Sequence, residues 1–249
     1  MKHRLELAIL PQPDETTCGP TCLHAAYGYY GDSVPLSDLI VQIPALDEGG
    51  TFAALLGAHA LSRGYRADLY TYNLRVFDPT WFPVEREVVL GKLQARRAAR
   101  PFPRLQLAID AYGEFLRRGG DVHFQDLTAG LIRSFLEQGR PIIAGLSSTY
   151  LYRSMREHGP KLEEDDVVGE PQGHFVVLCG YDRGDRTVLV ADPLHPNPAF
   201  QGMQYVVDME RVICSILLGI LTHDADLLII RPADNPAPGS AAGASAGNT

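Results

Sequence analysis

The apolar pattern of this chain changes from mostly helical in its first half to strand-like in its second half. Apolar residues with helical spacing recur in 18–31, 35–43, 51–62, 84–99, 105–118 and 127–138. Short strand-like runs lie at 5–10, 66–72, 141–146, 174–180, 187–191, 204–207 and 227–230. The segment 212–221 fits either a helix or a strand. Because helices and strands are largely segregated, the pattern predicts an α+β fold rather than alternating β–α–β units.

Composition narrows the class of protein. The chain of 249 residues is 45% hydrophobic and 21% charged, as in globular domains that bury a substantial core. Its net charge of -8 argues against general nucleic-acid binding, which needs a basic surface. The apolar stretch 213–221 is far shorter than the roughly 20 residues of a membrane helix, and the charged N-terminal segment is unlike a secretory signal. We therefore expect a cytoplasmic protein with no membrane partner.

The four cysteines are Cys18, Cys22, Cys179 and Cys214. In a cytosolic chain of this length, reduced thiols are the default. Cys18 and Cys22 have no second close pair to complete a zinc site, so we predict neither a metal nor a cofactor. A lone cysteine at a helix start is more often a small buried hydrophobe than a nucleophile, so a catalytic Cys18 needs support from other residues.

Cys18 stands where a helix is predicted to begin, and Pro20 suits the first turn of that helix. The positive end of the helix dipole favours the thiolate form of a cysteine placed there. The unpaired backbone N–H groups of the same turn can donate to a developing oxyanion. Gln12, six positions earlier, is a candidate second donor to the oxyanion; its alternative role is an exposed loop amide.

Two later segments supply a base and a carboxylate. His174 opens a strong strand run, where a rigid element positions a general base, and Gly173 before it leaves room for a substrate or a neighbouring side chain. Asp192 ends the next strand run, which a short hairpin joins to the first. A carboxylate in that place can orient the imidazole and stabilise its cation. The alternative for Asp192 is a turn residue before Pro193.

The segments from Gln12 to Leu23 and from His174 to Pro193 together resemble the cysteine peptidases that remove double-glycine leader peptides from bacteriocin precursors. These enzymes are a branch of the papain-like superfamily. The resemblance implies a papain-like fold, with an N-terminal helical part that carries the nucleophile at a helix N-terminus and packs on a C-terminal antiparallel sheet. It also implies a triad of Cys18, His174 and Asp192, with Gln12 in the oxyanion hole. A family member is a domain of a peptide-exporting transporter, but this chain has no Walker motif, so we expect a stand-alone form.

The resemblance leaves the middle of the chain without a counterpart. We expect one papain-like domain over residues 1–232 with a helical insertion at about 69–127. Residues 233–249 are rich in Ala, Gly, Ser and Pro, which is typical of a disordered tail. Gly49, Gly50 and Thr51 form a turn that, with Gly173, is a candidate wall of the substrate cleft, and Thr51 can cap the helix that follows.

A basic cluster stands out in this acidic chain and consists of Lys92, Arg96, Arg97, Arg100 and Arg104. Its ordinary explanation is a solvated helix face. The functional alternative is recognition of an acidic substrate or partner.

These features predict a thiol-dependent hydrolase that cleaves a peptide or amide bond through an acyl-enzyme. An acyltransferase or transpeptidase would use the same triad, and a non-catalytic peptide-binding module would keep the fold without the chemistry. The sequence identifies neither the substrate nor the oligomeric state.

Overall fold

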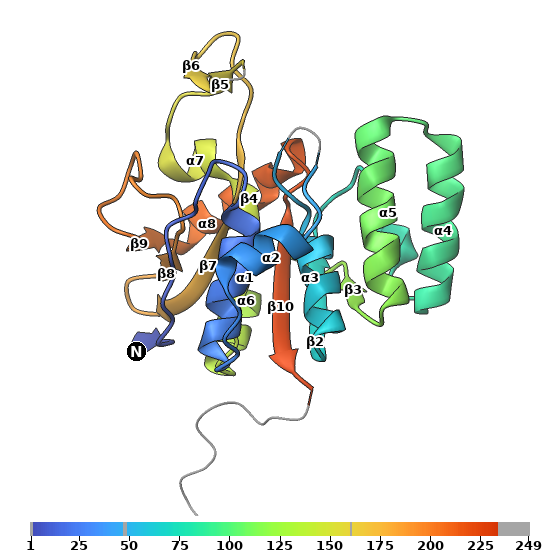
Figure 1. The fold of residues 1–249 in the computed structure, drawn as a ribbon, viewed down its shortest axis with the longest axis horizontal. Helices are drawn as coiled ribbons and strands as arrows, with labels where there is room; N and C mark the ends of the chain where they lie inside the picture. The colour runs from blue at the N-terminus through green and yellow to red at the C-terminus, as the bar shows by residue number, and fades with distance from the viewer. Residues whose placement is uncertain (1, 47–48, 160, 234–249) are drawn as a thin grey trace, which may run out of the picture.

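In the part of the chain that the computed structural model describes, residues 2–46, 49–159 and 161–233, eight strands form one sheet (Figure 1). Its order is β3 (Asp121–His123), β2 (Tyr65–Thr71), β10 (Asp226–Pro232), β4 (Ile142–Ser147), β7 (Gly173–Asp182), β8 (Thr187–Ala191) and β9 (Gln204–Asp208). The eighth strand, β1 (Lys2–Arg4), pairs with the end of β7. The pairs are antiparallel except β2 with β3, which is parallel.

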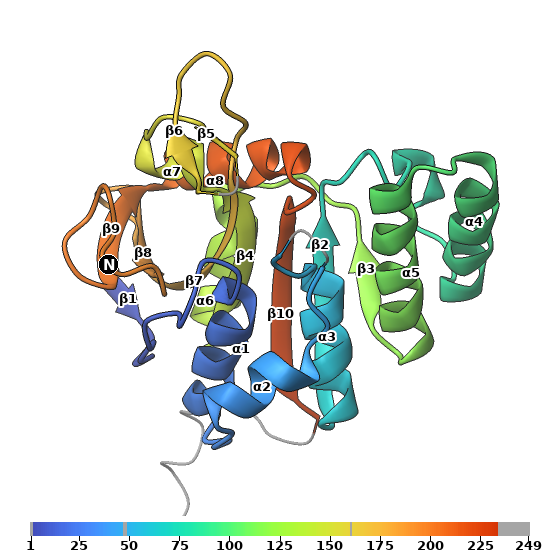
Figure 2. The same ribbon diagram turned by 45° about the horizontal axis from the view of Figure 1, so that its top comes forward.

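The central strands are covered on both faces. All residues of β4 are buried, as are the residues of β7 from His174 to Tyr181. Strands buried on both sides read as continuous apolar runs and need helices on each face. Here α1 (Cys18–Tyr29) and α3 (Ala53–Ser62) cover one face, and α6 (Ala129–Glu137) and α8 (Met209–Leu218) lie behind the sheet (Figures 1 and 2).

The helix that carries Cys18 is enclosed by its neighbours. Cys22, Leu23 and Tyr27 of α1 are fully buried, and α1 packs between β7 and α2 (Leu36–Gln42). Burying that much apolar surface around one helix fixes its axis firmly, because a core at crystal-like density does not let a packed helix slide. The first residue of α1 is thereby held at one end of β7.

A helical hairpin of α4 (Arg86–Ala99) and α5 (Pro103–Arg117) stands beside the sheet, after the short turn η1 (Pro79–Trp81) (Figure 1). The apolar face of α5 packs on α3. Gly57 of α3 permits the close approach, because a Cβ at this position would lie 2.6 Å from the Phe115 ring.

The chain between β4 and β7 forms α7 (Ser148–Tyr152) and then a small hairpin of β5 (Glu157–His158) and β6 (Glu163–Glu164). Figure 1 shows this hairpin projecting beyond the end of the sheet. A second short turn, η2 (Gly219–Leu221), follows α8 and leads into β10. These two segments lie at the same end of the sheet as the start of α1 (Figure 2).

The predicted α+β class is confirmed, and most predicted elements are found within a few residues of their expected bounds. The undecided segment 212–221 is the helix α8 followed by η2. Three strands of the sheet, β1, β2 and β3, come from the first half of the chain, so the segregation of helices and strands is incomplete.

Two local predictions are wrong. The run 5–10 has no regular secondary structure: β1 ends at Arg4, and beyond it only the Leu5 amide still bonds to the carbonyl of Cys179. Leu5, Leu7 and Ile9 are buried by side-chain packing and not by pairing in a ladder, whereas Ala8 and Leu10 are exposed. Thr51 does not cap α3, because Phe52 occupies the cap position and the Thr51 hydroxyl donates to the Pro44 carbonyl at 3.0 Å.

The division into one domain of residues 1–232 with an insertion at about 69–127 stays a prediction. Residues 234–249 of the expected tail, 233–249, lie outside the described residues.

Candidate active site

Cys18 is the first residue of α1 and is 7% exposed. The helix tip can approach its neighbours because Gly19 has no side chain: a Cβ there would lie 2.7 Å from the Thr51 methyl and 3.3 Å from the Phe175 ring. Within α1, the first amide with a main-chain acceptor one turn back is that of Thr21, which bonds to the carbonyl of Thr17. The amides of Cys18 and Gly19 are therefore oriented donors at the tip, where a helix has no internal acceptors for them.

His174 and Asp192 come from neighbouring antiparallel strands. His174 is the second residue of β7, and Asp192 follows the last residue of β8. The start of one strand and the end of its antiparallel partner lie at the same end of the sheet, which places the two side chains together. His174 Nε2 lies 2.8 Å from Asp192 Oδ1, and the side chains are 7% and 0% exposed.

The electrostatics of this pair favour an imidazolium beside a carboxylate. Burial lowers the pKa of His174, but the charges of Asp192 and Cys18, with hydrogen bonds to both, outweigh it and raise the pKa to about 10. Burial would raise the pKa of Asp192, but His174 and several donors hold it below its ordinary value. Since Nε2 of the imidazole bonds to Asp192, Nδ1 is the nitrogen that remains for the Cys18 thiol.

Four donors besides His174 hold the Asp192 carboxylate. The Tyr152 hydroxyl donates to Oδ2 at 2.7 Å, and the Tyr205 hydroxyl donates to the same oxygen. The Asn197 side-chain amide donates to Oδ2 at 3.2 Å, and the Leu194 backbone amide donates to Oδ1 at 2.9 Å. A carboxylate with so many donors keeps its charge even when it is fully buried. Sequence reasoning missed these partners; only Asn197 and Leu194 stand near Asp192 in the chain.

Gln12 is tied to the same loop by its backbone and not by its side chain. Its amide N–H donates to the carbonyl of Pro193 at 2.9 Å. Its side-chain Nε2 donates to the carbonyl of Asp14 at 2.9 Å, and Gln12 is not part of the wall of the cavity that Cys18 and His174 line. In this arrangement the Gln12 amide is engaged locally, and its part in an oxyanion hole stays a prediction.

A cavity of about 770 Å³ opens over Cys18 and His174. The four residues predicted to bind substrate all line it: Gly49, Gly50, Thr51 and Gly173. The space that Gly173 leaves is taken by a neighbour, because a Cβ at this position would lie 2.0 Å from Oδ2 of Asp224. Asp224 itself lines the cavity and was not predicted from the sequence.

The other cysteines are placed differently from Cys18. Cys22 is fully buried, its Sγ donates to the Phe175 carbonyl at 3.2 Å, and burial raises the pKa of its thiol well above the ordinary value. Cys179 is also buried, and burial likewise raises its pKa, whereas Cys214 is exposed. Among the described thiols, Cys18 is the one that lies on the cavity beside an imidazole.

Two further findings concern the described residues alone. Among them, no group of three or more His, Cys, Asp or Glu side chains is arranged to hold a metal ion. Within the same ranges, no helix is both long enough and apolar enough to cross a membrane.

Residues 109–212 match the family model described as "Peptidase_C39 like family"; this span contains His174 and Asp192 and begins after Cys18. No curated protein matches the chain.

Solved structures of C39-type peptidases resemble the chain. A C39-like peptidase from Bacillus anthracis is 14% identical, with 93% of this chain and 98% of that chain covered and a TM-score of 0.50. A double-glycine motif protease from an AMS/PCAT transporter, solved with its leader peptide, is 16% identical over 93% and 95% of the two chains, with a TM-score of 0.45. The peptidase domain of Streptococcus ComA, a bi-functional ABC transporter, is 14% identical over 90% and 97%, with a TM-score of 0.43.

At 14% identity, the Bacillus anthracis structure is evidence for the fold of this chain alone. The family match is evidence for residues 109–212. The match begins inside the predicted insertion at about 69–127, whose bounds stay a prediction. The predicted resemblance to this group of peptidases is confirmed by the match of the C39-like family model to residues 109–212 and, for the fold, by the C39-like structure from Bacillus anthracis.

Proposed function

We propose that the chain is a cysteine peptidase that cleaves a peptide or amide bond through an acyl-enzyme on Cys18. The observation that carries the proposal is the chain of contacts from Cys18 to His174 to Asp192, in which Cys18 and His174 line one cavity and Asp192 is buried behind them. The match to a C39-like peptidase family supports the same activity.

The nucleophile in this proposal is the Cys18 thiolate. The imidazole of His174, held charged by Asp192, favours a thiolate beside it, and the end of α1 adds the positive potential of a helix N-terminus. The thiolate attacks the carbonyl carbon of the substrate and forms a tetrahedral intermediate. His174 then gives its proton to the leaving amine, and the C–N bond breaks to leave a thioester on Cys18.

Backbone amides of the α1 tip are the proposed oxyanion donors. Those of Cys18 and Gly19 lie beside the sulfur, and one such donor is worth roughly 10²–10³ in rate when its geometry is right. Gln12 is the proposed second donor, which requires its side-chain amide to leave the Asp14 carbonyl when substrate binds. In the second half of the reaction, His174 takes a proton from water, and the resulting hydroxide releases the acyl group as a free acid.

Asp192 orients the imidazole in this scheme and does not exchange a proton. Its donors Tyr152, Tyr205 and Asn197 are positioning residues, because they touch the carboxylate and not the reacting atoms.

The test of an activated nucleophile uses two thiols of the same chain. Iodoacetamide is added near neutral pH, and the alkylation rates of Cys18 and the exposed Cys214 are followed separately by peptide mapping. We expect Cys18 to react at least about tenfold faster than Cys214, although it is buried and Cys214 is exposed. Equal rates, or a slower Cys18, would overturn the proposed nucleophile.

Turnover is tested with a peptide mixture read by mass spectrometry, with and without an added amine acceptor. Free acids as products support hydrolysis, and amides of the acceptor reveal acyl transfer by the same thioester. The Cys18→Ala variant, which should still fold and melt cooperatively, should give neither product. Products at the wild-type rate from that variant would exclude the acyl-enzyme.

A further inference from the structure

One wall of the active-site cavity is the turn 222–224, which joins η2 to β10 and has no part in the proposed chemistry. In this turn the His223 amide donates to the Ile220 carbonyl at 3.4 Å. The Asp224 amide donates to the Gly219 carbonyl at 2.8 Å. Two bonds of this kind close the C-terminal end of a helix around one residue in the left-handed conformation, and that residue is usually glycine. Here it is His223, with a φ of 70°.

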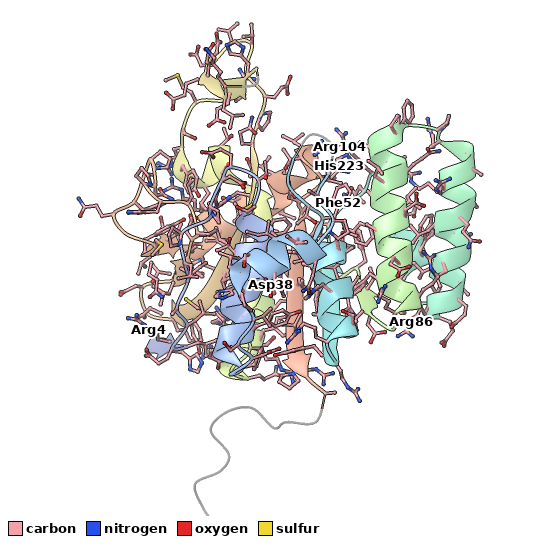
Figure 3. All side chains as sticks on the ribbon, viewed as in Figure 1. Arg4, Asp38, Phe52, Arg86, Arg104 and His223 are labelled. Atoms are coloured by element: carbon pink, nitrogen blue, oxygen red, sulfur yellow. The ribbon has the colours of Figure 1, made fainter. Side chains whose placement is uncertain are left out.

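His223 costs free energy in this conformation that a glycine would avoid, because a Cβ crowds the neighbouring carbonyl. Residues held in this way are found preferentially at functional sites. The side chain of His223 is also fixed by its neighbours and is 6% exposed. Its ring meets that of Phe52 edge-on at 6.4 Å, and its Nδ1 lies 3.4 Å from the side-chain nitrogen of the fully buried Asn73. Figure 3 shows His223 directly above Phe52, beside the upper end of α5.

The hydrogen bonds of Asn73 decide which ring nitrogen of His223 carries the proton. The Arg75 backbone amide donates to Oδ1 of Asn73 at 3.1 Å, so the side-chain nitrogen of Asn73 is the atom that faces His223. That nitrogen can only donate, so Nδ1 accepts and the proton of the neutral ring is on Nε2. Burial lowers the pKa of His223 to about 4, and the charges of Arg104 and Arg75 lower it as well, so the ring is neutral near pH 7.

The Nε2–H group of His223 is an open donor on the cavity wall. Within the described residues, Nδ1 takes part in the hydrogen bond with Asn73 and Nε2 takes part in none. Nε2 is also not among the enclosed polar atoms that lack a partner in these ranges, so it is accessible from the cavity that His223 lines. A ligand in the cavity can therefore accept a hydrogen bond from it.

A short series of contacts joins His223 to the nucleophile. The ring of His223 meets that of Phe52, and Phe52 follows Thr51 in the chain. The Thr51 methyl packs on the tip of α1, where a Cβ on Gly19 would lie 2.7 Å from it. Gly19 is bonded to Cys18, the first residue of α1. The same wall of the cavity therefore reaches from the imidazole to the thiol.

A second series of contacts joins the turn to the base. A Cβ on Gly173 would lie 2.0 Å from Oδ2 of Asp224 and 2.7 Å from Oγ1 of Thr222. The turn is thus packed directly on the residue that precedes His174. His223 stands between Thr222 and Asp224, so it is held within one turn of the chain from the base. A peptide that reaches the thiol and the base together must pass along this wall.

We infer that His223 is a substrate-binding residue, whose Nε2–H donates to a main-chain carbonyl oxygen of the peptide that Cys18 attacks. This inference rests on the proposed peptidase function and adds to it that the substrate continues as a peptide beyond the scissile bond. An extended peptide presents a carbonyl about every 3.4 Å, so one of them comes within reach of a fixed donor. A neutral N–H suits a carbonyl oxygen, which has no net charge. Glycine would fit the turn but would supply no donor.

The test measures how much a peptide chain accelerates the alkylation of Cys18. On the leaving-group side, bromoacetyl-Ala-Ala-NH2 is compared with bromoacetamide. On the acyl side, acetyl-Ala-Ala-chloromethyl ketone is compared with chloroacetone. In each reaction the Cys18 sulfur displaces the halide and forms a thioether, and peptide mapping near neutral pH gives the second-order rate constant. The peptide gain is the rate constant of the peptide reagent divided by that of the small reagent, each taken relative to a model thiol.

Four variants separate the donor from the rest of the side chain. His223→Asn keeps an acceptor oxygen near the place of Nδ1, tolerates the left-handed conformation and removes Nε2–H. His223→Gly, the residue that the turn favours, removes the same donor. His223→Gln keeps an amide N–H near the place of Nε2. His158→Asn is the matched control, because it changes an exposed histidine that is not part of the cavity wall.

We expect a peptide gain above that of a model thiol in at least one of the two series. His223→Asn and His223→Gly should each lower this gain about three- to tenfold, as the loss of one hydrogen bond provides. His223→Gln should keep most of the gain, and His158→Asn should keep all of it. The series that shows the gain identifies the side of the scissile bond on which the carbonyl lies. Urea unfolding shows which variants fold, and either of the first two is sufficient to test the donor.

The possible results separate this inference from the proposed function. The inference is wrong if neither series shows a gain in the native chain, or if removing the donor leaves the gain unchanged. It is also wrong if His223→Gln loses as much as His223→Asn, because the gain would then depend on the ring and not on its N–H. If bromoacetamide alkylates Cys18 no faster than a model thiol, the proposed function itself fails.

Discussion

Replacing Asp192 with asparagine removes one charge from the buried pair with His174 and keeps the shape of the side chain. In the native chain burial lowers the pKa of His174, and the charges of Asp192 and Cys18 raise it to about 10. In Asp192→Asn only Cys18 opposes burial, so the pKa falls towards its ordinary value of 6.5. At about 1.4 kcal/mol per pKa unit, a loss of the whole shift is worth about 5 kcal/mol, at the upper end of the roughly 3–5 kcal/mol for breaking a buried ion pair by removing one partner.

The loss has a defined pH dependence. A histidine whose pKa is raised by folding stabilises the folded chain fully below its unfolded pKa of 6.5, and this stabilisation disappears as pH rises through about 10. Asp192, whose pKa is lowered, contributes only above its ordinary value of 3.8. The deficit of Asp192→Asn in unfolding free energy should therefore be largest between about pH 4 and 6.5 and shrink towards pH 10.

Urea unfolding over this pH range, followed by circular dichroism and by the fluorescence of Trp81, measures the deficit. Asp185→Asn, an exposed carboxylate in the β7–β8 turn, serves as the charge-matched control and should show almost no deficit. The same urea unfolding series is measured for Cys18→Ala. Its deficit gives the contribution of the thiol to the unfolding free energy, separately from that of the Asp192 carboxylate. A deficit that is constant with pH, or that grows from pH 6 to pH 10, would refute the view that an imidazolium–carboxylate pair stabilises this site.

Two further predictions concern the surroundings of the site. Gly145→Ala should lower the unfolding free energy by about 1–3 kcal/mol, because its Cβ would lie 2.3 Å from the main-chain oxygen of Asp224. Gly91→Ala, in open space on α4, should raise the unfolding free energy by about 0.5–1 kcal/mol. Equal melting temperatures for the two variants would contradict this prediction. Burial raises the pKa of Asp226, which accepts from the Tyr112 hydroxyl, to about 7. The native chain should therefore lose stability relative to Asp226→Asn as pH rises from about 4 to 7, by up to about 1.4 kcal/mol per pH unit. Urea midpoints that change equally with pH in the native chain and in Asp226→Asn would exclude this prediction.

Local sequence signals were sufficient for the elements that carry the site. The predicted start of α1 at Cys18, the strand from His174 and the strand ending before Asp192 are all found, because start signals and apolar runs act over a few residues. Local signals failed where burial came from distant partners. The strand β3 is three residues long and pairs only with β2, and the run 5–10 is apolar because it packs on the core rather than because it joins a ladder.

The side chains around Cys18, His174 and Asp192 were beyond local signals for the same reason. Tyr152 stands 40 residues from Asp192 in the chain, and its contact with Asp192 depends on the packing of α7 against α8, β4 and β7. Gly173 was predicted to leave space, but the sequence does not say that Asp224 fills it. Contacts of this kind are set by the relative placement of whole elements, which no short window of sequence specifies.

The sequence by itself determined which segments form helices or strands and which residues stand at their ends, because helix starts, strand runs and turns depend on patterns of a few neighbouring residues. It thereby placed a thiol at a helix tip and an imidazole and a carboxylate at strand ends. Tertiary structure alone decided what surrounds them: the donors that keep Asp192 charged, and the residues from distant segments that line the cavity over Cys18 and His174. These arrangements arise when the core packs and brings remote segments to one edge of the sheet, and packing depends on the whole chain at once.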